Sequence, residues 1–205
     1  MNVFQKMLLK YWGEGDLSKI QAVKVGIAGT GGLGSNCACM LARSGVQRFA
    51  LADRDCVEFS NLNRQFFFAD QLGRPKVEAL KHNLLRINPD LEIDVFRLEI
   101  HAGNLDALFG DCHAIVEAFD RAEAKKMLLE HYWDSGKLVV AASGVAGLAN
   151  IEGIRTQRLR DNIYLVGDLV SEAGAGIPPL APGVSAAAAK QANAVLMWVL
   201  GEEQF

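Results

Sequence analysis

A glycine-rich turn is the first feature of the sequence whose residue types and spacing could bind a ligand. Residues 29–34 read Gly-Thr-Gly-Gly-Leu-Gly, after a short apolar segment that predicts a buried strand and before a segment that predicts a helix. Gly29 permits a tight turn, Gly31 lets the backbone approach a phosphate, and Gly34 lets the helix pack closely on the sheet. The free N–H groups at the start of the helix favour an anion. We therefore predict a nucleotide-binding turn, made by Gly29, Gly31, Gly32 and Gly34.

A carboxylate follows this turn at a spacing that suits a nucleotide. Asp53 comes 19 residues after Gly34, at the end of a second predicted strand over Arg48–Asp53. A carboxylate in this position can accept hydrogen bonds from ribose hydroxyls. The turn and the acid together predict nucleotide binding. NAD is the ordinary ligand of this pattern, and the pattern by itself does not choose between nucleotides.

Two basic segments point away from NAD and toward phosphoryl chemistry. The loop after Asp53 ends in Asn-Leu-Asn-Arg-Gln, and an arginine aimed at a nucleotide can neutralise charge as it develops. Arg74 and Lys76 flank Pro75 at the start of a predicted helix, where positive charge is mildly unfavourable unless an anion is bound. The alternatives are a solvated polar loop and two exposed charges that cost little in salt water.

Asp120 follows the fourth predicted strand, which covers Ala114–Phe119. Ligands bind open parallel sheets at this end of the strands, and a carboxylate beside a triphosphate is a natural Mg²⁺ ligand. The alternative is structural, because an aspartate that opens a helix is a common N-cap, here for a predicted helix over Arg121–Ser135. Both interpretations remain open on the sequence alone.

The elements that would position these residues alternate between strand and helix. Further strands are expected over Glu92–Ile100, Lys137–Ala142, Ile151–Arg158 and Asn162–Asp168, and further helices over Ser35–Ser44, Pro75–Ile87 and Val184–Leu200. We predict an α/β fold with a Rossmann-like open sheet, parallel in its first part, with antiparallel strands in its C-terminal part and helices on both faces. Residues 1–22 predict an N-terminal helical segment broken near Gly13, with Asp16 as an N-cap, and Gly201 is expected to end the last helix.

Composition excludes several classes of protein. The 205 residues are half hydrophobic with a net charge of −3, so we expect one domain over 1–205, no transmembrane segment and no broad nucleic-acid surface. The four cysteines are isolated, without a Cys-x-x-Cys pair, which favours a reducing cytoplasm over a disulfide scaffold and predicts no structural zinc. No targeting segment is recognisable. These four cysteines are Cys37, Cys39, Cys56 and Cys112.

The order of these motifs resembles the ThiF/MoeB/ubiquitin-activating-enzyme superfamily. The resemblance rests on GxGGLGS, the strand-ending Asp53, SNLNRQ, GRPKVEA, RINP at 86–89 and Asp120, and it extends from about Lys24 to Gly201. The sequence is most similar to the short ThiF-type group linked to the sulfur carrier ThiS. Such a resemblance implies ATP-dependent adenylation of the C-terminal glycine carboxylate of a small ubiquitin-like protein that ends in Gly-Gly, giving an acyl-adenylate and pyrophosphate.

The resemblance also implies roles for single residues. Asp53 would hold the ribose, Asn61 would lie near the phosphates, Arg64 and Lys76 would neutralise the triphosphate, and Asp120 would bind Mg²⁺. The attacking carboxylate is already an anion, so the site must supply charge neutralisation and in-line positioning instead of a general base. Residues 170–183 would form a crossover loop, and the relatives imply a homodimer.

The sequence departs from the superfamily in ways that limit its chemistry. No cysteine follows Cys112, so sulfur is expected to come from a separate donor protein. Relatives carry an N-terminal Arg-rich segment that reaches the partner subunit, whereas this chain has only Lys6 and Lys10 there. Arg121 stands where relatives usually have Asn.

Two other functions stay open. The superfamily includes a tRNA threonylcarbamoyladenosine dehydratase with a similar NxNRQ loop, although an acidic pI of about 5.8 counts against tRNA binding. A non-catalytic or NAD-binding Rossmann module is the second alternative. The joint presence of Arg64, Lys76 and Asp120 counts against it.

Overall fold

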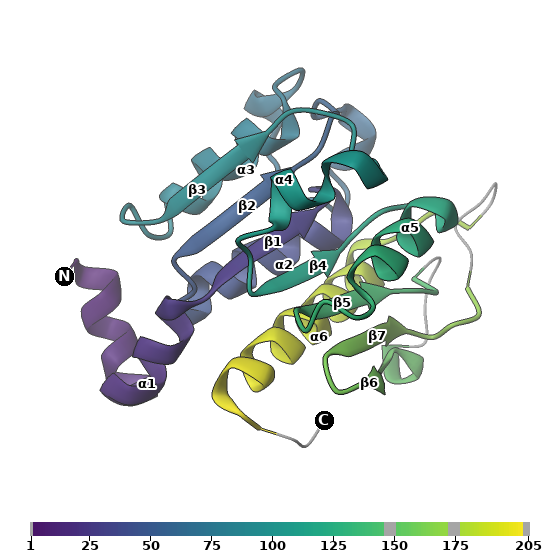
Figure 1. The fold of residues 1–205 in the computed structure, drawn as a ribbon. Coiled ribbons are helices and arrows are strands. Elements are labelled where there is room, and N and C mark those ends of the chain that lie inside the picture. Colours follow the sequence, from purple (N-terminus) through teal and green to yellow (C-terminus); the bar gives the residue numbers. More distant parts are fainter. Residues whose placement is uncertain (1, 146–150, 172–176, 203–205) are drawn as a thin grey trace.

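A seven-stranded open sheet organises the chain in the computed structural model, which describes residues 2–145, 151–171 and 177–202 (Figure 1). The strand order is β3-β2-β1-β4-β5-β7-β6. The strands are β1 Lys24–Ala28, β2 Arg48–Ala52, β3 Glu92–Phe96, β4 Ala114–Glu117, β5 Leu138–Ala142, β6 Arg155–Arg160 and β7 Ile163–Gly167. The α-helices are α1 Val3–Ala22, α2 Gly32–Ser44, α3 Lys76–Leu85, α4 Leu105–Phe109, α5 Ala122–Tyr132 and α6 Ala181–Leu200.

The predicted fold class is confirmed, and the structure sharpens its C-terminal part. Strands β1 to β5 are parallel to their neighbours, and β7 also pairs in parallel with β5. Only β6 runs antiparallel, as the outer strand of a hairpin with β7 that turns at residues 161–162. A bulge between Arg158 and Arg160 interrupts the register of this hairpin.

Helices cover both faces of the sheet, and each face has its own apolar core. Figure 1 shows α4 and α5 in front of the sheet and α2 and α6 behind it. The larger core packs α1, α2, α3 and α6 against alternate strand residues such as Val25, Ile27 and Phe49. The smaller core packs α4 and α5 against the intervening positions, among them Ala28 and Ala50. This period of two is what a strand buried on both faces requires.

Several element boundaries differ from those expected. Helix α1 is interrupted at Gly13, whose φ of 71° is non-helical, which confirms the expected break. Asp16 lies inside the helical part that follows Gly13 and is not an N-cap. Helix α2 begins at Gly32, three residues before the expected start, and α6 begins at Ala181, so that it includes the end of the expected loop over 170–183. Within that loop, residues 172–176 lie outside the described part.

Two further differences concern segments after β2. Strand β3 ends at Phe96, although the alternation of apolar residues continues to Ile100. Helix α4 was not expected, because five residues are too few to show a helical period.

Gly201 ends α6 in the left-handed conformation, as expected. Among the described helices, none combines the length and apolar character that crossing a bilayer demands.

Candidate functional site

A cleft of about 900 Å³ opens where β1, β2, β4 and β5 end in their carboxyl-terminal loops. Most of the residues assigned from the sequence line it, namely Gly29, Gly31, Gly32, Asp53, Asn61, Arg64, Lys76 and Asp120. Gly34 does not line the cleft. It lies under the first turn of α2, where a Cβ would overlap the carbonyl oxygen of Gly29 and would lie 2.9 Å from Ile27 Cγ2.

The glycine turn is shaped by close backbone packing. Gly29 has a φ of 93°, and a Cβ there would lie 2.9 Å from the carbonyl oxygen of Ala118. Gly31 is the N-cap of α2 and supplies no side-chain hydrogen bond to the helix. The turn therefore brings the N-terminus of α2 to the wall of the cleft, and the first N–H groups of a helix have no intrahelical acceptor, as an anion site requires.

Asp53 is fixed at the end of β2 by the residues around it. Its Oδ2 accepts hydrogen bonds from the backbone N of Thr30 (2.7 Å) and from Thr30 Oγ1 (3.1 Å), and its Oδ1 accepts from Asp55 N (2.9 Å). The carboxylate is thus held against the glycine turn, with remaining lone pairs available to a ligand hydroxyl.

Arg64 and Asn61 lie in the loop after β2, which is tied to α2. Asn36 Nδ2 donates to the carbonyl oxygen of Arg64 at 2.8 Å, so the loop follows the helix start. The Arg64 guanidinium is bound to its own loop, because Nη1 donates to Ser60 O at 3.0 Å and to Asn63 Oδ1 at 2.8 Å. Asn61 is buried, and its Oδ1 accepts from Glu58 N at 3.0 Å.

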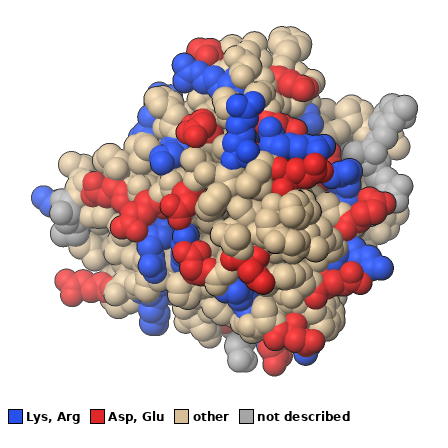
Figure 2. All heavy atoms as spheres, turned by 45° about the horizontal axis from the view of Figure 1, so that its top comes forward, with Lys and Arg blue, Asp and Glu red and all other residues tan. Residues whose placement is uncertain are grey.

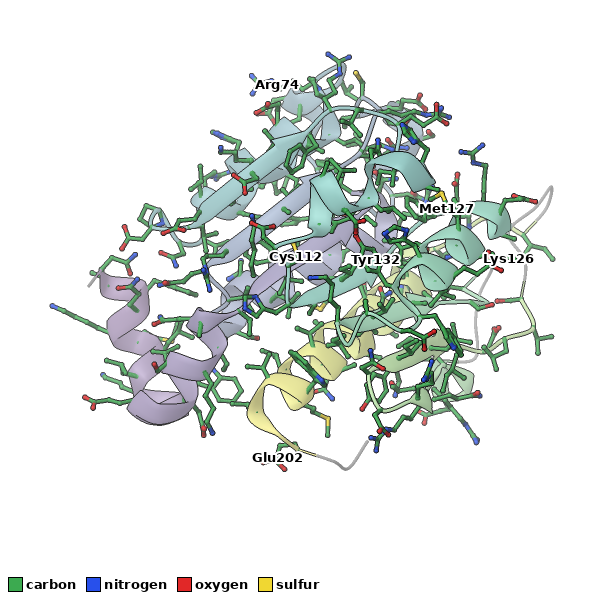
Figure 3. The ribbon with its side chains drawn as sticks, viewed as in Figure 1. Arg74, Cys112, Lys126, Met127, Tyr132 and Glu202 are labelled. Carbon is green, nitrogen blue, oxygen red and sulfur yellow. The ribbon has the colours of Figure 1, made fainter. Side chains whose placement is uncertain are left out.

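Lys76 is the first residue of α3, and its side chain is only 8% exposed. Its Nζ lies 3.0 Å from Asp55 Oδ2. The alternative that Lys76 is an exposed charge is therefore wrong. Arg74 does not line the cleft and lies at the outer edge of the molecule (Figure 3). Pro75 precedes the helix as its N-cap, one position earlier than expected.

Asp120 is exposed in the cleft, two residues before α5 begins at Ala122. The N-cap position belongs to Arg121, so the helix-cap alternative for Asp120 is wrong. Within residues 2–145, 151–171 and 177–202, no group of three or more His, Cys, Asp or Glu could hold a metal. One free carboxylate beside a phosphate site suits Mg²⁺, which keeps phosphate and water ligands.

A buried ion pair lies under Asp120. Glu117 is fully buried, and its carboxylate accepts from Lys125 Nζ at 3.0 and 3.2 Å, from Phe119 N at 2.7 Å and from Ala142 N at 3.2 Å. Burial raises the pKa of Glu117, and the Lys125 ammonium opposes this only in part. This pair fixes the loop that carries Asp120 to the ends of β4 and β5.

The cleft also contains polar residues to which the sequence patterns give no role. The most informative of them are Asp55, Gln65 and Lys125. Asp55 and Gln65 lie in the same loop after β2 as Asn61 and Arg64, so their polar side chains could have been predicted to face the ligand. The ion pair between Lys125 and Glu117 is harder to predict, because its only sequence indication is a spacing of eight residues across the end of a strand.

The cysteines do not contribute to the cleft. Cys37 and Cys112 are buried, and burial raises the pKa of both thiols, that of Cys112 to about 12. Cys112 and Tyr132 lie in the smaller core below α4 and α5 (Figure 3). A thiol in such surroundings is a packing residue.

Surface charge is mixed. On the face seen in Figure 2, lysines and arginines are interspersed with aspartates and glutamates instead of gathering into one basic field. The outer edge of β6 carries three arginines, Arg155, Arg158 and Arg160. Two of them are paired with Asp161 and Asp134. Charged side chains on an open edge strand are an ordinary protection against pairing with other chains.

The fold and the cleft together define a Rossmann-like α/β protein with a glycine turn and a helix N-terminus beside a cleft at the carboxyl ends of its parallel strands. The chain belongs to the ThiF family, whose sequence profile matches residues 4–204. The superfamily indicated by the motifs is thereby confirmed.

Among curated proteins, the chain is similar to ubiquitin-like modifier-activating enzyme 5. The chicken (Gallus gallus) protein is 45% identical over 85 residues, which are 42% of this chain and 21% of that protein. The rat (Rattus norvegicus) protein is 44% identical over 95 residues, 46% of this chain and 24% of that protein. The matched part is thus less than a quarter of the length of these relatives.

Solved structures share the fold at low sequence identity. The E. coli tRNA N6-threonylcarbamoyladenosine dehydratase TcdA, in complex with ATP, has a TM-score of 0.88 at 18% identity, covering 96% of this chain and 93% of that one. E. coli MccB with ATP has a TM-score of 0.74 at 23% identity, covering 100% of this chain and 65% of that one.

Proposed function

We propose that this protein uses ATP to adenylate the C-terminal glycine carboxylate of a small ubiquitin-like sulfur carrier similar to ThiS. The observation that carries the proposal is the convergence of Arg64, Lys76 and Asp120 on one cleft beside the glycine turn. Membership of the ThiF family supports it, and so do the ATP complexes of the structural neighbours TcdA and MccB. Thiamine thiazole synthesis, or a related sulfur transfer, would use the product.

Each cleft residue has a task in this reaction. Asp53 accepts from the ribose hydroxyls, while the N–H groups at the start of α2 and Asn61 hold phosphate oxygens. Lys76 and Arg64 neutralise charge as the carrier carboxylate attacks the α-phosphorus and pyrophosphate leaves. For this, Arg64 exchanges its bonds to Ser60 and Asn63, and Lys76 its bond to Asp55, for phosphate oxygens. These intramolecular acceptors are exposed or belong to the loop, so the exchange requires no change in the core.

Asp120 fits an Mg²⁺ ion that is bound together with the triphosphate. Its carboxylate is exposed in the cleft and has no hydrogen bond or ion pair with the part of the chain that the structure describes. When bound, Mg²⁺ would neutralise phosphate charge. The contribution of the protein is to hold Asp120 in place through Glu117 and Lys125.

The carrier and the wider assembly belong to the same proposal. Residues 1–205 would act as one adenylation domain in a cytoplasmic homodimer, and the segment that precedes α6, residues 170–180, would form the crossover loop. Sulfur would come from a separate donor protein, because no cysteine follows Cys112 and none of the four cysteines lines the cleft.

Exchange of labelled pyrophosphate into ATP tests the proposal. We expect exchange that requires Mg²⁺ and a small carrier protein ending in Gly-Gly. Arg64→Ala should lower the exchange rate by about 10²–10³, the usual cost of losing one strong electrostatic donor. The matched control is Arg74→Ala, which lies outside the cleft and should keep the wild-type rate. Absence of exchange with every ubiquitin-like carrier tested would reject the carrier as substrate.

A second function is favoured by one specific observation. The match to TcdA covers nearly the whole of both chains, whereas MccB extends well beyond this chain. A tRNA-linked carboxylate would be activated by the same adenylation chemistry in the same cleft. ATP hydrolysis stimulated by tRNA, and weakened steeply by salt, would select this function over the carrier.

The third alternative, an NAD-binding module, predicts a different ligand response. The proposal expects ATP with Mg²⁺ to raise the midpoint of thermal unfolding and NAD(H) to leave it unchanged. The reverse result would favour the NAD-binding module.

A further inference from the structure

The amide of Gln65, in the cleft, has no hydrogen-bond partner among the described residues. Gln65 lines the cleft, and only 9% of its surface is exposed. Its Oε1 is buried without a hydrogen bond. Across the described ranges 2–145, 151–171 and 177–202, its Nε2 also donates to no residue. The whole amide is therefore unpaired within the part of the chain that the structure describes.

A neighbouring glutamine shows that this is not the rule for the region. Gln71 is buried to a similar degree, but its amide is paired with that of Asn83, donating at 2.8 Å and accepting at 3.0 Å. A buried carbonyl left unpaired costs stability, and native proteins rarely keep one without a reason. A ligand that completes the hydrogen bonds of Gln65 is such a reason.

The place of Gln65 indicates which ligand group it meets. Its Nε2 would lie 3.7 Å from a Cβ on Gly31, the N-cap residue of the 13-residue helix α2. The backbone around it is fixed, since Gln65 N donates to Asn61 O at 2.9 Å and Phe67 N donates to Gln65 O at 2.8 Å. The amide is thus held against the phosphate-binding turn, whereas the guanidinium of Arg64 is exposed on the adjoining loop.

We propose that Gln65 is a nucleotide-binding residue whose Nε2 donates a hydrogen bond to a phosphate oxygen held at Gly31. Its buried Oε1 accepts from a hydroxyl or a water that enters with the nucleotide. This inference rests on the proposed function, because it requires a phosphate ligand at the glycine turn. It adds a neutral donor, already in position, to the two cations that must change partners.

Gln65→Met tests this role, because methionine has nearly the same length and makes no comparable hydrogen bond. We expect the affinity for ATP with Mg²⁺, measured by calorimetry, to fall about 10-fold or more, the usual value of a hydrogen bond to a charged group. The midpoint of thermal unfolding without nucleotide should stay the same or rise, because the substitution removes an unpaired buried group.

Gln71→Met is the matched control. It removes an amide of similar burial that is fully paired, so it should lower the unfolding midpoint and keep the ATP affinity. A Gln65→Met protein that binds ATP as well as wild type would overturn the assignment. If Gln65→Met lowers the midpoint of thermal unfolding as much as Gln71→Met does, Gln65 has a structural role, and this result would also overturn the assignment.

Gln65→Asn is the variant to measure if Gln65→Met fails to fold. It retains the amide but withdraws it from Gly31, so ATP affinity should fall with little change in unfolding midpoint, and wild-type affinity would contradict the proposal. Failure of the two proposals can be told apart. Wild-type protein that binds ATP but shows no carrier-dependent exchange rejects the carrier proposal alone, whereas wild-type affinity in Gln65→Met rejects the role of Gln65 alone.

Discussion

At the amino-terminal edge of the sheet, two lysine ammonium groups are bound to partners that belong to the fold. Lys24, whose side chain is 14% exposed, contacts Asp94 at 2.7 Å and Asp111 at 2.6 Å. Lys137 Nζ donates to the carbonyl oxygens of Gly110 and Cys112, both at 2.7 Å. Each of these two ammonium groups is thus shared between two acceptors.

At the carboxyl-terminal edge, the polar groups of the cleft are incompletely paired. Lys76 is buried to a greater extent than Lys24, yet it contacts one carboxylate, that of Asp55, which is itself 54% exposed. Asp120 and the Gln65 amide have no partner within the described residues. Buried polar atoms without a partner in the described residues also occur outside the cleft, at Asn88 Nδ2 and Gln191 Oε1. The contrast between the edges therefore lies in their cations, because Lys76 has one exposed carboxylate where Lys24 has two, and it favours the carboxyl-terminal edge as the one that binds a ligand.

The largest effect on stability is expected from substituting Lys125, which lines the cleft but whose partner, Glu117, is buried in the fold. Lys125→Met leaves the Glu117 carboxylate buried without a cation, which typically costs about 3–5 kcal/mol. Burial raises the pKa of Glu117, so the folded protein binds a proton more tightly than the unfolded chain and stability falls as pH rises between the two pKa values. Urea unfolding should therefore show a greater loss at pH 8 than at pH 5.

The control for this variant is Lys126→Met. Lys126 is 73% exposed and forms a surface pair with Glu130, so its loss should change the free energy of unfolding by about 0.5 kcal/mol or less. Figure 3 shows Lys126 on the outer side of α5. Equal effects of the two substitutions would mean that the Glu117–Lys125 pair does not stabilise the strand ends.

Lys76→Met tests the difference between the two edges, because it should lower the affinity for ATP and leave the free energy of unfolding nearly unchanged. ATP affinity is expected to fall about 10- to 100-fold, since a charged donor to phosphate is lost. The free energy of unfolding should change little, because the Asp55 left behind is solvated. Calorimetric titration and urea unfolding measure the two quantities on one sample. Arg74→Met, outside the cleft, should leave both unchanged, and a large loss of stability in Lys76→Met would contradict the contrast.

The smallest effect is expected at the opposite edge, from Asp111→Asn. The hydrogen bond from Lys24 lowers the pKa of Asp111, so this carboxylate stabilises the fold above the pKa it has in the unfolded chain. That contribution is lost as pH falls through its pKa in the folded state. Urea unfolding should show a loss of less than about 1 kcal/mol at pH 7 that disappears near pH 2. ATP affinity should be unchanged, and any loss of it would contradict the separation of the two edges.

Sequence patterns predict the sheet well and its short or ligand-facing segments less well. The glycine turn and the alternation of strands and helices were sufficient for the fold class. Strand β3 was predicted too long because Leu98 and Ile100 continue its alternation, although they line the cleft and pack on the smaller core. Helix α2 was predicted too short, since Gly32 and Gly34 have low helix propensity but their close packing overrides it.

The sequence predicts which residues lie at the cleft, but it does not predict the contacts between their side chains. Motif spacing placed Asp53, Lys76 and Asp120 at one edge, because parallel strands end together. The contact between Lys76 and Asp55 joins residues 21 apart, and the missing partner of Gln65 depends on the packing of α2. Contacts of this kind follow from tertiary structure, and no local pattern in the sequence encodes them.

Transfer of label from ATP to a carrier protein tests the central claim most directly. With ATP labelled at the α-phosphate, a carrier that ends in Gly-Gly should become labelled at its C-terminus while pyrophosphate is released. A carrier lacking its last glycine, and the Arg64→Ala enzyme, should give little or no label. Label that reaches the carrier from the γ-phosphate instead, with release of ADP, would contradict adenylation.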